Sequence, residues 1–127
     1  MVFPIAEQFR AAYGRVRELA LATVLSVGTI GTGLCYPRGD LDYWLAEVPV
    51  APGGSLAVSV RGVTGLTLDV RVQTTTGKDL GHFRVGGESS APTRVSPAGA
   101  VCCLIQIREA SGRGANPRDR YSLSVLP

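Results

Sequence analysis

Hydrophobic positions change their spacing near residue 24, and the change predicts two kinds of structure. Over residues 4–23 apolar side chains recur every three or four positions, which is the period of an amphipathic helix. Pro4 suits the first turn of such a helix. The predicted helix would carry one apolar stripe, which contains Ile5, Phe9, Tyr13 and Val16. Such a stripe packs on the rest of the chain, on a partner protein or on a second copy.

From residue 25 onward apolar and polar residues alternate, which is typical of strands with one buried face. The clearest stretches are residues 41–48, 56–61 and 66–73, with Trp44 on an inward face. Residues 101–107 are apolar at nearly every position, so we expect a central strand covered on both faces. Turn-forming residues separate these stretches about every 8–12 positions. The pattern predicts a mainly β fold, an antiparallel β-sandwich of seven to eight strands.

Two stretches are less regular. Residues 25–30 alternate and predict a strand, which Gly31 and Gly33 would then loosen. Residues 111–119 are rich in Gly, Asn and Pro and predict a loop. A closing strand follows, with Tyr121 on its inward face. The expected organisation is therefore an N-terminal helix over residues 1–23 and a sandwich over residues 24–127.

Composition is consistent with one folded domain. The chain has 127 residues, of which 45 % are hydrophobic and only 18 % are charged, so wholesale disorder is not expected. The net charge is +3, and the arginines are scattered among acidic residues. A nucleic-acid partner is not predicted, because such proteins gather basic residues on one face. Residues 19–36 lack charge, but their glycines and threonines make a membrane span or signal core a poor interpretation.

The three cysteines, Cys35, Cys102 and Cys103, do not have zinc-site spacing. Cys102 and Cys103 lie in the most apolar stretch, where alternation places their sulfurs on opposite faces. They are expected either as small buried hydrophobic residues or, for one of them, as the partner of Cys35 in a disulfide. We take Cys35–Cys103 as the candidate bridge.

A turn at residues 37–40 places Asp40 and Asp42 before an expected strand. Such a turn is usually solvated, so these carboxylates are expected to cap backbone N–H groups rather than to act as a catalytic pair. The only histidine is His82. A Ser–His–Asp set could be assembled only from Ser89 or Ser90, His82 and Asp79, and no nucleophile motif supports it. An enzyme is therefore not predicted.

The order of short motifs resembles the bacterial pre-peptidase C-terminal domain, a collagen-binding-like family. The shared pieces span about residues 20–126 and read Leu25-Ser26-Val27-Gly28, Asp40-Leu41-Asp42-Tyr43-Trp44, Ala51-Pro52-Gly53, Leu66-Thr67-Leu68-Asp69-Val70, Pro97-Ala98-Gly99 and Tyr121-Ser122-Leu123-Ser124-Val125. The resemblance implies a jelly-roll-like β-sandwich that accompanies secreted proteins, often proteases, and is not itself catalytic.

The resemblance and the sequence pattern together lead to expectations about function, location and metal binding. The expected function is a non-catalytic accessory binding or scaffolding module for protein–protein contact or surface attachment. The alternative is a self-assembling structural subunit whose N-terminal helix packs between copies. Contacts are expected at the helix stripe and at Tyr36 or Tyr43. The resemblance implies a location outside the cytoplasm, but the sequence shows no signal peptide, so a cytoplasmic location is the alternative. Some family members bind calcium through an acidic segment before the first strand together with an Asp-x-Asp pair. Here Arg15-Val16-Arg17-Glu18 occupies that segment, and Asp40 and Asp42 alone supply too few oxygens, so no cofactor is predicted and calcium at these two residues is only the alternative.

Overall fold

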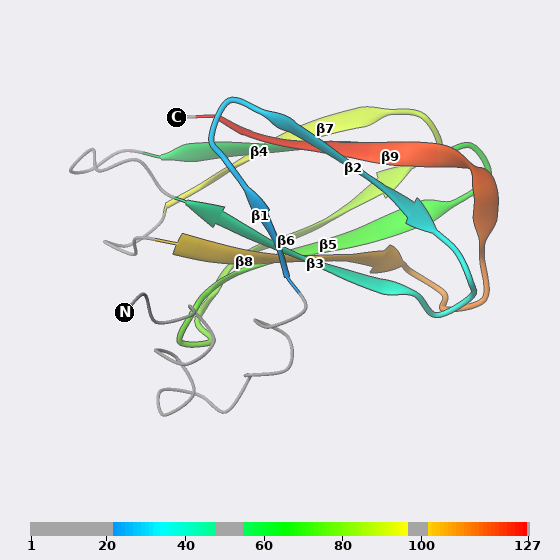
Figure 1. Cartoon of the computed structure of the whole chain (residues 1–127), viewed down its shortest axis with the longest axis horizontal. Helices are drawn as coiled ribbons and strands as arrows, with labels where there is room; N and C mark the ends of the chain where they lie inside the picture. Colours follow the sequence, from blue (N-terminus) through cyan, green and yellow to red (C-terminus); the bar gives the residue numbers. More distant parts are fainter. Residues whose placement is uncertain (1–21, 48–54, 97–101, 127) are drawn as a thin grey trace.

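The chain folds into two β-sheets packed face to face (Figure 1). The computed structural model describes residues 22–47, 55–96 and 102–126. In these ranges one sheet has the order β1-β3-β8-β5-β6 and the other β2-β9-β4-β7. The strands are β1 (Thr23–Leu25), β2 (Ile30–Cys35), β3 (Leu41–Glu47), β4 (Leu56–Arg61), β5 (Thr67–Thr74), β6 (Asp79–Gly86), β7 (Ser90–Val95), β8 (Cys102–Glu109) and β9 (Asn116–Leu126). The predicted sandwich is confirmed, with nine strands in this part of the chain.

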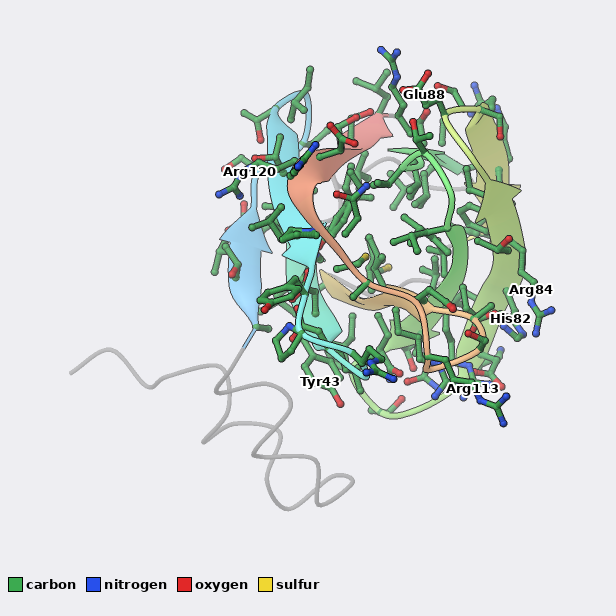
Figure 2. All side chains as sticks on the ribbon, turned by 90° about the vertical axis from the view of Figure 1, so that its right-hand side faces the viewer. Tyr43, His82, Arg84, Glu88, Arg113 and Arg120 are labelled. Atoms are coloured by element: carbon green, nitrogen blue, oxygen red, sulfur yellow. The ribbon has the colours of Figure 1, made fainter. Side chains whose placement is uncertain are left out.

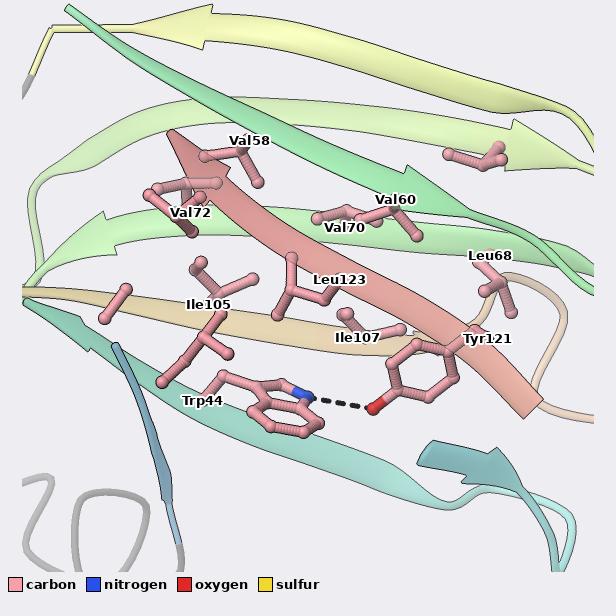
Figure 3. Close-up of a cluster of buried hydrophobic side chains, with 14 of the residues drawn as sticks. Trp44, Val58, Val60, Leu68, Val70, Val72, Ile105, Ile107, Tyr121 and Leu123 are labelled. Atoms are coloured by element: carbon pink, nitrogen blue, oxygen red, sulfur yellow. Dashed lines mark hydrogen bonds between the residues drawn. The ribbon is translucent and has the colours of Figure 1, made fainter. Parts of the chain in front are cut away.

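Alternating side chains from both sheets form the core, as the sequence pattern predicts. Trp44 of β3, Val58 of β4, Val70 of β5 and Tyr121 of β9 all point into it (Figure 3). β8 lies in the middle of its sheet, between β3 and β5. Its neighbouring Leu104 and Ile105 point to opposite faces and both have no exposed surface. The prediction of a central strand covered on both faces is therefore confirmed.

The strand predicted over residues 25–30 is wrong. Thr23–Leu25 forms β1, which pairs parallel with β3, and the chain then turns and enters the other sheet as β2. The Thr29 hydroxyl donates to the Ser26 carbonyl over 2.6 Å, and Gly28 has a φ of 85°, which favours glycine. Alternation of residue types continues through this turn and hides it. β1 is also an exception to the antiparallel pairing that we expected.

Two other boundaries also differ from the prediction. The predicted N-terminal helix lies almost entirely outside the described residues, but its last residue, Thr23, is the first residue of β1. Residues 116–119 were expected in a loop and instead begin β9. There the Asn116 side-chain oxygen accepts hydrogen bonds from the backbone N–H groups of Arg118 and Asp119. The described ranges contain no helix long and apolar enough to cross a membrane.

Candidate functional site

A hydrogen-bonded row of three side chains joins the two sheets at one side of the sandwich. Trp44 of β3 donates its indole N–H to the Tyr121 hydroxyl of β9 over 2.8 Å (Figure 3). That hydroxyl donates in turn to a carboxylate oxygen of Asp42 over 2.5 Å. The Trp44 and Tyr121 rings meet edge to face, with centroids 6.5 Å apart. Buried polar atoms are thereby satisfied while both rings remain in the core.

Two glycines of β2 make room for these rings. A Cβ atom on Gly31 would lie 2.6 Å from the Trp44 ring, and one on Gly33 would lie 2.6 Å from the Cζ atom of Tyr121. Gly31 and Gly33 are two residues apart, so both face the same side of the strand. The sequence suggested that these glycines loosen a strand. The register of β2 against β9 does shift between Gly33 and Cys35, and the glycines also allow β2 to lie directly against the aromatic pair.

Burial of this row changes its electrostatics. Burial raises the pKa of the Asp42 carboxyl, although the hydrogen bond from Tyr121 acts in the opposite direction. Burial also raises the pKa of the Tyr121 phenol far above its usual range, and the hydrogen bond to Asp42 adds to the effect. Tyr121 has no exposed surface. The buried phenol of Tyr121 therefore keeps its proton at neutral pH and donates it in the hydrogen bond to Asp42.

A groove of about 500 Å³ lies beside this row, between the β1–β3 edge of one sheet and β2 of the other. Its lining combines aromatic, hydroxyl and charged side chains, namely Thr32, Tyr36, Asp40, Tyr43, Trp44 and Arg120. Figure 2 shows Tyr43 and Arg120 near β1 and β2, far from His82 and Arg84 at the opposite edge. Both tyrosines that the sequence suggested as contacts thus line the same groove.

The two acids of the turn have different surroundings. Both carboxylates line the groove and both residues are partly exposed, but Asp42 also accepts the hydrogen bond of the Tyr121 hydroxyl. Sequence reasoning assigned both to a solvated turn and so missed the bond between Asp42 and Tyr121. The signal was the spacing of Asp42 and Trp44, two residues apart on one face. In the described part of the chain, no group of three or more His, Cys, Asp or Glu residues could hold a metal ion.

A second polar cluster lies on the outer face of the five-stranded sheet, around Asp69 of β5. Asp69 is 6 % exposed, and its carboxylate lies 2.7 Å from His82 Nε2 and 3.4 Å from Arg84 Nε. Arg108 Nε is 3.7 Å away. Burial acts to raise the pKa of Asp69, but the hydrogen bond and charge of His82, together with the arginines, hold it below its usual value. The cluster neutralises one buried charge with neighbours from two adjacent strands.

The catalytic set that the sequence could offer is not assembled. His82 pairs with Asp69, whereas Asp79 accepts a hydrogen bond from Gln73. The hydroxyl of Ser89 donates to the carbonyl of Gly86. The structure thus does not bring a serine, His82 and Asp79 together.

The cysteines are free thiols in this structure, and no bridge joins Cys35 to Cys103. Cys103 is six residues before Glu109 in β8, a distance of about 20 Å along the strand. Cys35 ends β2 and is followed by the short turn to Leu41, which pairs with Arg108 at the far end of β8 from Cys103. A disulfide needs Cα atoms less than about 7 Å apart. Burial is the main cause that raises the pKa of Cys35 and of Cys103 to about 11.

The apolar stripe of Ile5, Phe9, Tyr13 and Val16 lies outside the described residues. Its role as a contact surface therefore stays a prediction.

Comparison with known proteins gives a likeness of fold. No family model and no curated protein matches the sequence. Among solved structures, the chain is similar to the pre-peptidase C-terminal domain of a collagenase from Bacillus anthracis, with a TM-score of 0.62 and 14 % identity. The match covers 82 % of this chain and 93 % of that domain. At this identity the likeness shows the fold, and the resemblance seen in the sequence motifs is confirmed at that level.

Proposed function

We propose that this chain, which has the fold of a pre-peptidase C-terminal domain, is a non-catalytic accessory module that binds a partner protein. The binding surface is the groove beside β2, and the bound element is an extended segment of the partner. The observation that carries this proposal is the concentration of exposed apolar side chains at that edge. Val24, Ile30 and Tyr36 are 58 %, 72 % and 56 % exposed, and all three lie in or next to β1 and β2.

The strand arrangement supports an extended ligand. β1 and β2 are edge strands of their sheets, and the groove runs between them. An edge strand presents backbone N–H and C=O groups that a further strand can pair with. Tyr36 and Tyr43 offer flat apolar surfaces with polar tips, and Asp40 and Arg120 offer one charge of each sign. Such a surface suits a polypeptide better than a small molecule.

The similar solved domain belongs to a collagenase, which suggests the chemistry of the partner. A fibrous protein offers long extended segments, and we infer that a partner of this kind is bound outside the cytoplasm. Collagen and its unfolded form, gelatin, are therefore the first probes. Unfolded casein is the control for binding to any extended chain.

The test compares two lysine substitutions on opposite edges of one sheet. Ile30→Lys places a charge on the β2 edge, and Ser90→Lys adds the same charge on β7 at the other edge. A lysine on an edge strand opposes strand addition. We expect Ile30→Lys to weaken binding to immobilised gelatin about tenfold, which corresponds to about 1.4 kcal/mol, with Ser90→Lys close to wild type.

Equal binding by both variants would contradict the proposed edge. Absence of binding to collagen, gelatin and casein would contradict the proposed partner class. The alternative predicted from the sequence, self-assembly with the N-terminal helix between copies, is tested separately. Self-assembly requires that the average mass of the particles formed by the full chain in solution increase with protein concentration.

A further inference from the structure

The polar cluster around Asp69 holds more positive charge than its one buried carboxylate needs. Arg84 and Arg108 both approach Asp69 through Nε, and Arg71 of β5 lines the space beside it. Three guanidinium groups therefore surround one carboxylate, which leaves an excess of two positive charges even with His82 neutral. The side chains of Arg84 and Arg108 are 66 % and 58 % exposed, and Figure 2 shows His82 and Arg84 extending away from the ribbon. The excess charge is therefore open to a ligand.

A small space lies within this cluster. It has a volume of about 80 Å³ and is lined by Asp69, Arg71, Gln106 and Arg108. The register of β5 against β8 explains this lining, because Asp69 is paired with Arg108 and Arg71 with Gln106. Their chain neighbours on both strands belong to the core, so all four side chains project from the outer face of the sheet. The volume suits one small polar group of a larger ligand.

The donors around this space suit an anion with three terminal oxygens. Within the described residues, the side chains of Arg71 and Arg108 donate no hydrogen bond, so their N–H groups are available. The Gln106 amide donates to Gln73 over 3.3 Å and keeps a second hydrogen. A carboxylate has two oxygens and is satisfied by a single guanidinium fork, whereas a sulfate ester presents three oxygens. Three donor side chains from two strands therefore favour a sulfate ester.

The position of the cluster in the sheet argues for the kind of chain that carries this anion. β5 pairs with β6 on one side and with β8 on the other, so its backbone has no free edge for an added peptide strand. A ligand is held here only through its own charged groups. Arg84 and His82 lie on β6, outside the small space, where they would face the next anionic group of a repeating ligand. A stiff chain that carries anions at short intervals loses little conformational entropy on such a face.

We propose that this cluster binds the sulfate esters of an acidic polysaccharide. Asp69 holds Arg84 and Arg108 in place, while Arg71, Gln106 and Arg108 donate to one sulfate group. The cluster lies far from the groove beside β2 (Figure 2), so this proposal does not depend on the partner proposed for the groove.

The test measures binding of the full chain to immobilised dextran sulfate, with unsulfated dextran as the uncharged probe. Arg71→Gln removes one donor of the space and leaves the contacts of Asp69 with His82, Arg84 and Arg108 intact. Arg61→Gln is the matched control, because it removes the same charge from an exposed side chain on the outer face of the other sheet. We expect Arg71→Gln to weaken binding to dextran sulfate about tenfold, with Arg61→Gln close to wild type.

Arg108→Gln should also weaken binding, and urea unfolding of each variant shows that the sandwich stays folded. Three results would overturn the proposal. The first is equal binding of dextran sulfate and dextran by the wild type, and the second is an equal loss in Arg71→Gln and Arg61→Gln. The third is binding of polyglutamate or single-stranded DNA that is as tight as that of dextran sulfate and as sensitive to Arg71→Gln, which would assign the surface to another class of chain.

Discussion

Asp42 shows how far the environment of a single residue can depart from its sequence context. Two acids beside a glycine turn suggest a solvated corner, but Asp42 is half-buried and bonded to a tyrosine 79 positions later. The inward side of Trp44 could be predicted from alternation. The hydrogen bond between Asp42 and Tyr121 could not be predicted, because it depends on how the sheet that contains β3 packs against the sheet that contains β9. Long-range pairing of this kind leaves no local signal apart from the shared face of Asp42 and Trp44.

Removal of the Tyr121 hydroxyl should destabilise the fold. Tyr121→Phe leaves both the Asp42 carboxylate and the Trp44 indole N–H without their partner. An unsatisfied buried group costs about 1–3 kcal/mol, so we expect a loss of that size in the free energy of unfolding at pH 7. Urea denaturation measures it. The control Tyr36→Phe removes the hydroxyl of an exposed tyrosine and should change stability by less than about 0.5 kcal/mol.

The loss of stability caused by Tyr121→Phe should also depend on pH. Because the pKa of Asp42 is raised in the folded state, the folded protein binds this proton more tightly than the unfolded chain. The contribution of Asp42 to stability therefore decreases as the pH rises from the ordinary pKa of an aspartate through the raised pKa of Asp42 in the folded state. The Tyr121 hydrogen bond lowers this pKa, so Tyr121→Phe should raise it further and be more costly at pH 7 than at pH 4. An equal loss at both values would contradict the assigned role of the bond.

At the scale of elements, β2 was the hardest strand to predict. Glycine usually weakens a strand, and here two glycines in four residues suggested an irregular segment. The register of β2 does shift after Gly33, but the missing side chains of the two glycines also bring β2 against Trp44 and Tyr121. A sequence-based assignment weighs the entropy cost of glycine but does not include the aromatic rings of other strands. Strands with bulky alternating residues, such as β4 and β5, were placed correctly because their own side chains form the core.

Gly31→Ala should therefore destabilise the sandwich, although alanine is the better strand residue. The added methyl group would lie 2.6 Å from the Trp44 ring, and the ring must move. Overpacking of this kind costs about 1–3 kcal/mol. Thr32→Ala, at an exposed position of the same strand, is the matched control. Thermal and urea unfolding should separate the two variants, and equal stability would show that β2 does not depend on this close approach.

At the scale of the molecule, the fold class, the central position of β8 and the inward faces of most strands could be predicted from alternation and turns. The assignment of strands to two sheets could not, because β1 and β2 are adjacent in sequence and belong to different layers. The groove results from that switch, since one of its walls comes from each sheet. The charged residues around Asp69 were also unpredicted, because their pairing needs the register of β5 with β6 and β8.

The sandwich should be equally stable with and without a reducing agent. Its cysteines are free thiols, and Cys35 and Cys103 lie too far apart for a bridge. A disulfide across so long a loop would contribute about 4 kcal/mol. We expect the midpoint of thermal unfolding to change by less than about 1 °C when dithiothreitol is added. A decrease of several degrees would show that a bridge forms in solution after all.

The place of β9 has a consequence for the order of events during synthesis. Asn116–Leu126 is the last of the described strands of this sandwich to be made, and it pairs with β2 on one side and β4 on the other. Until it leaves the ribosome, the four-stranded sheet is two unconnected pieces, and the Trp44 indole has no phenol to meet. The five-stranded sheet can therefore pair before β9 is made, whereas the four-stranded sheet and the core between the sheets are completed only by this late strand.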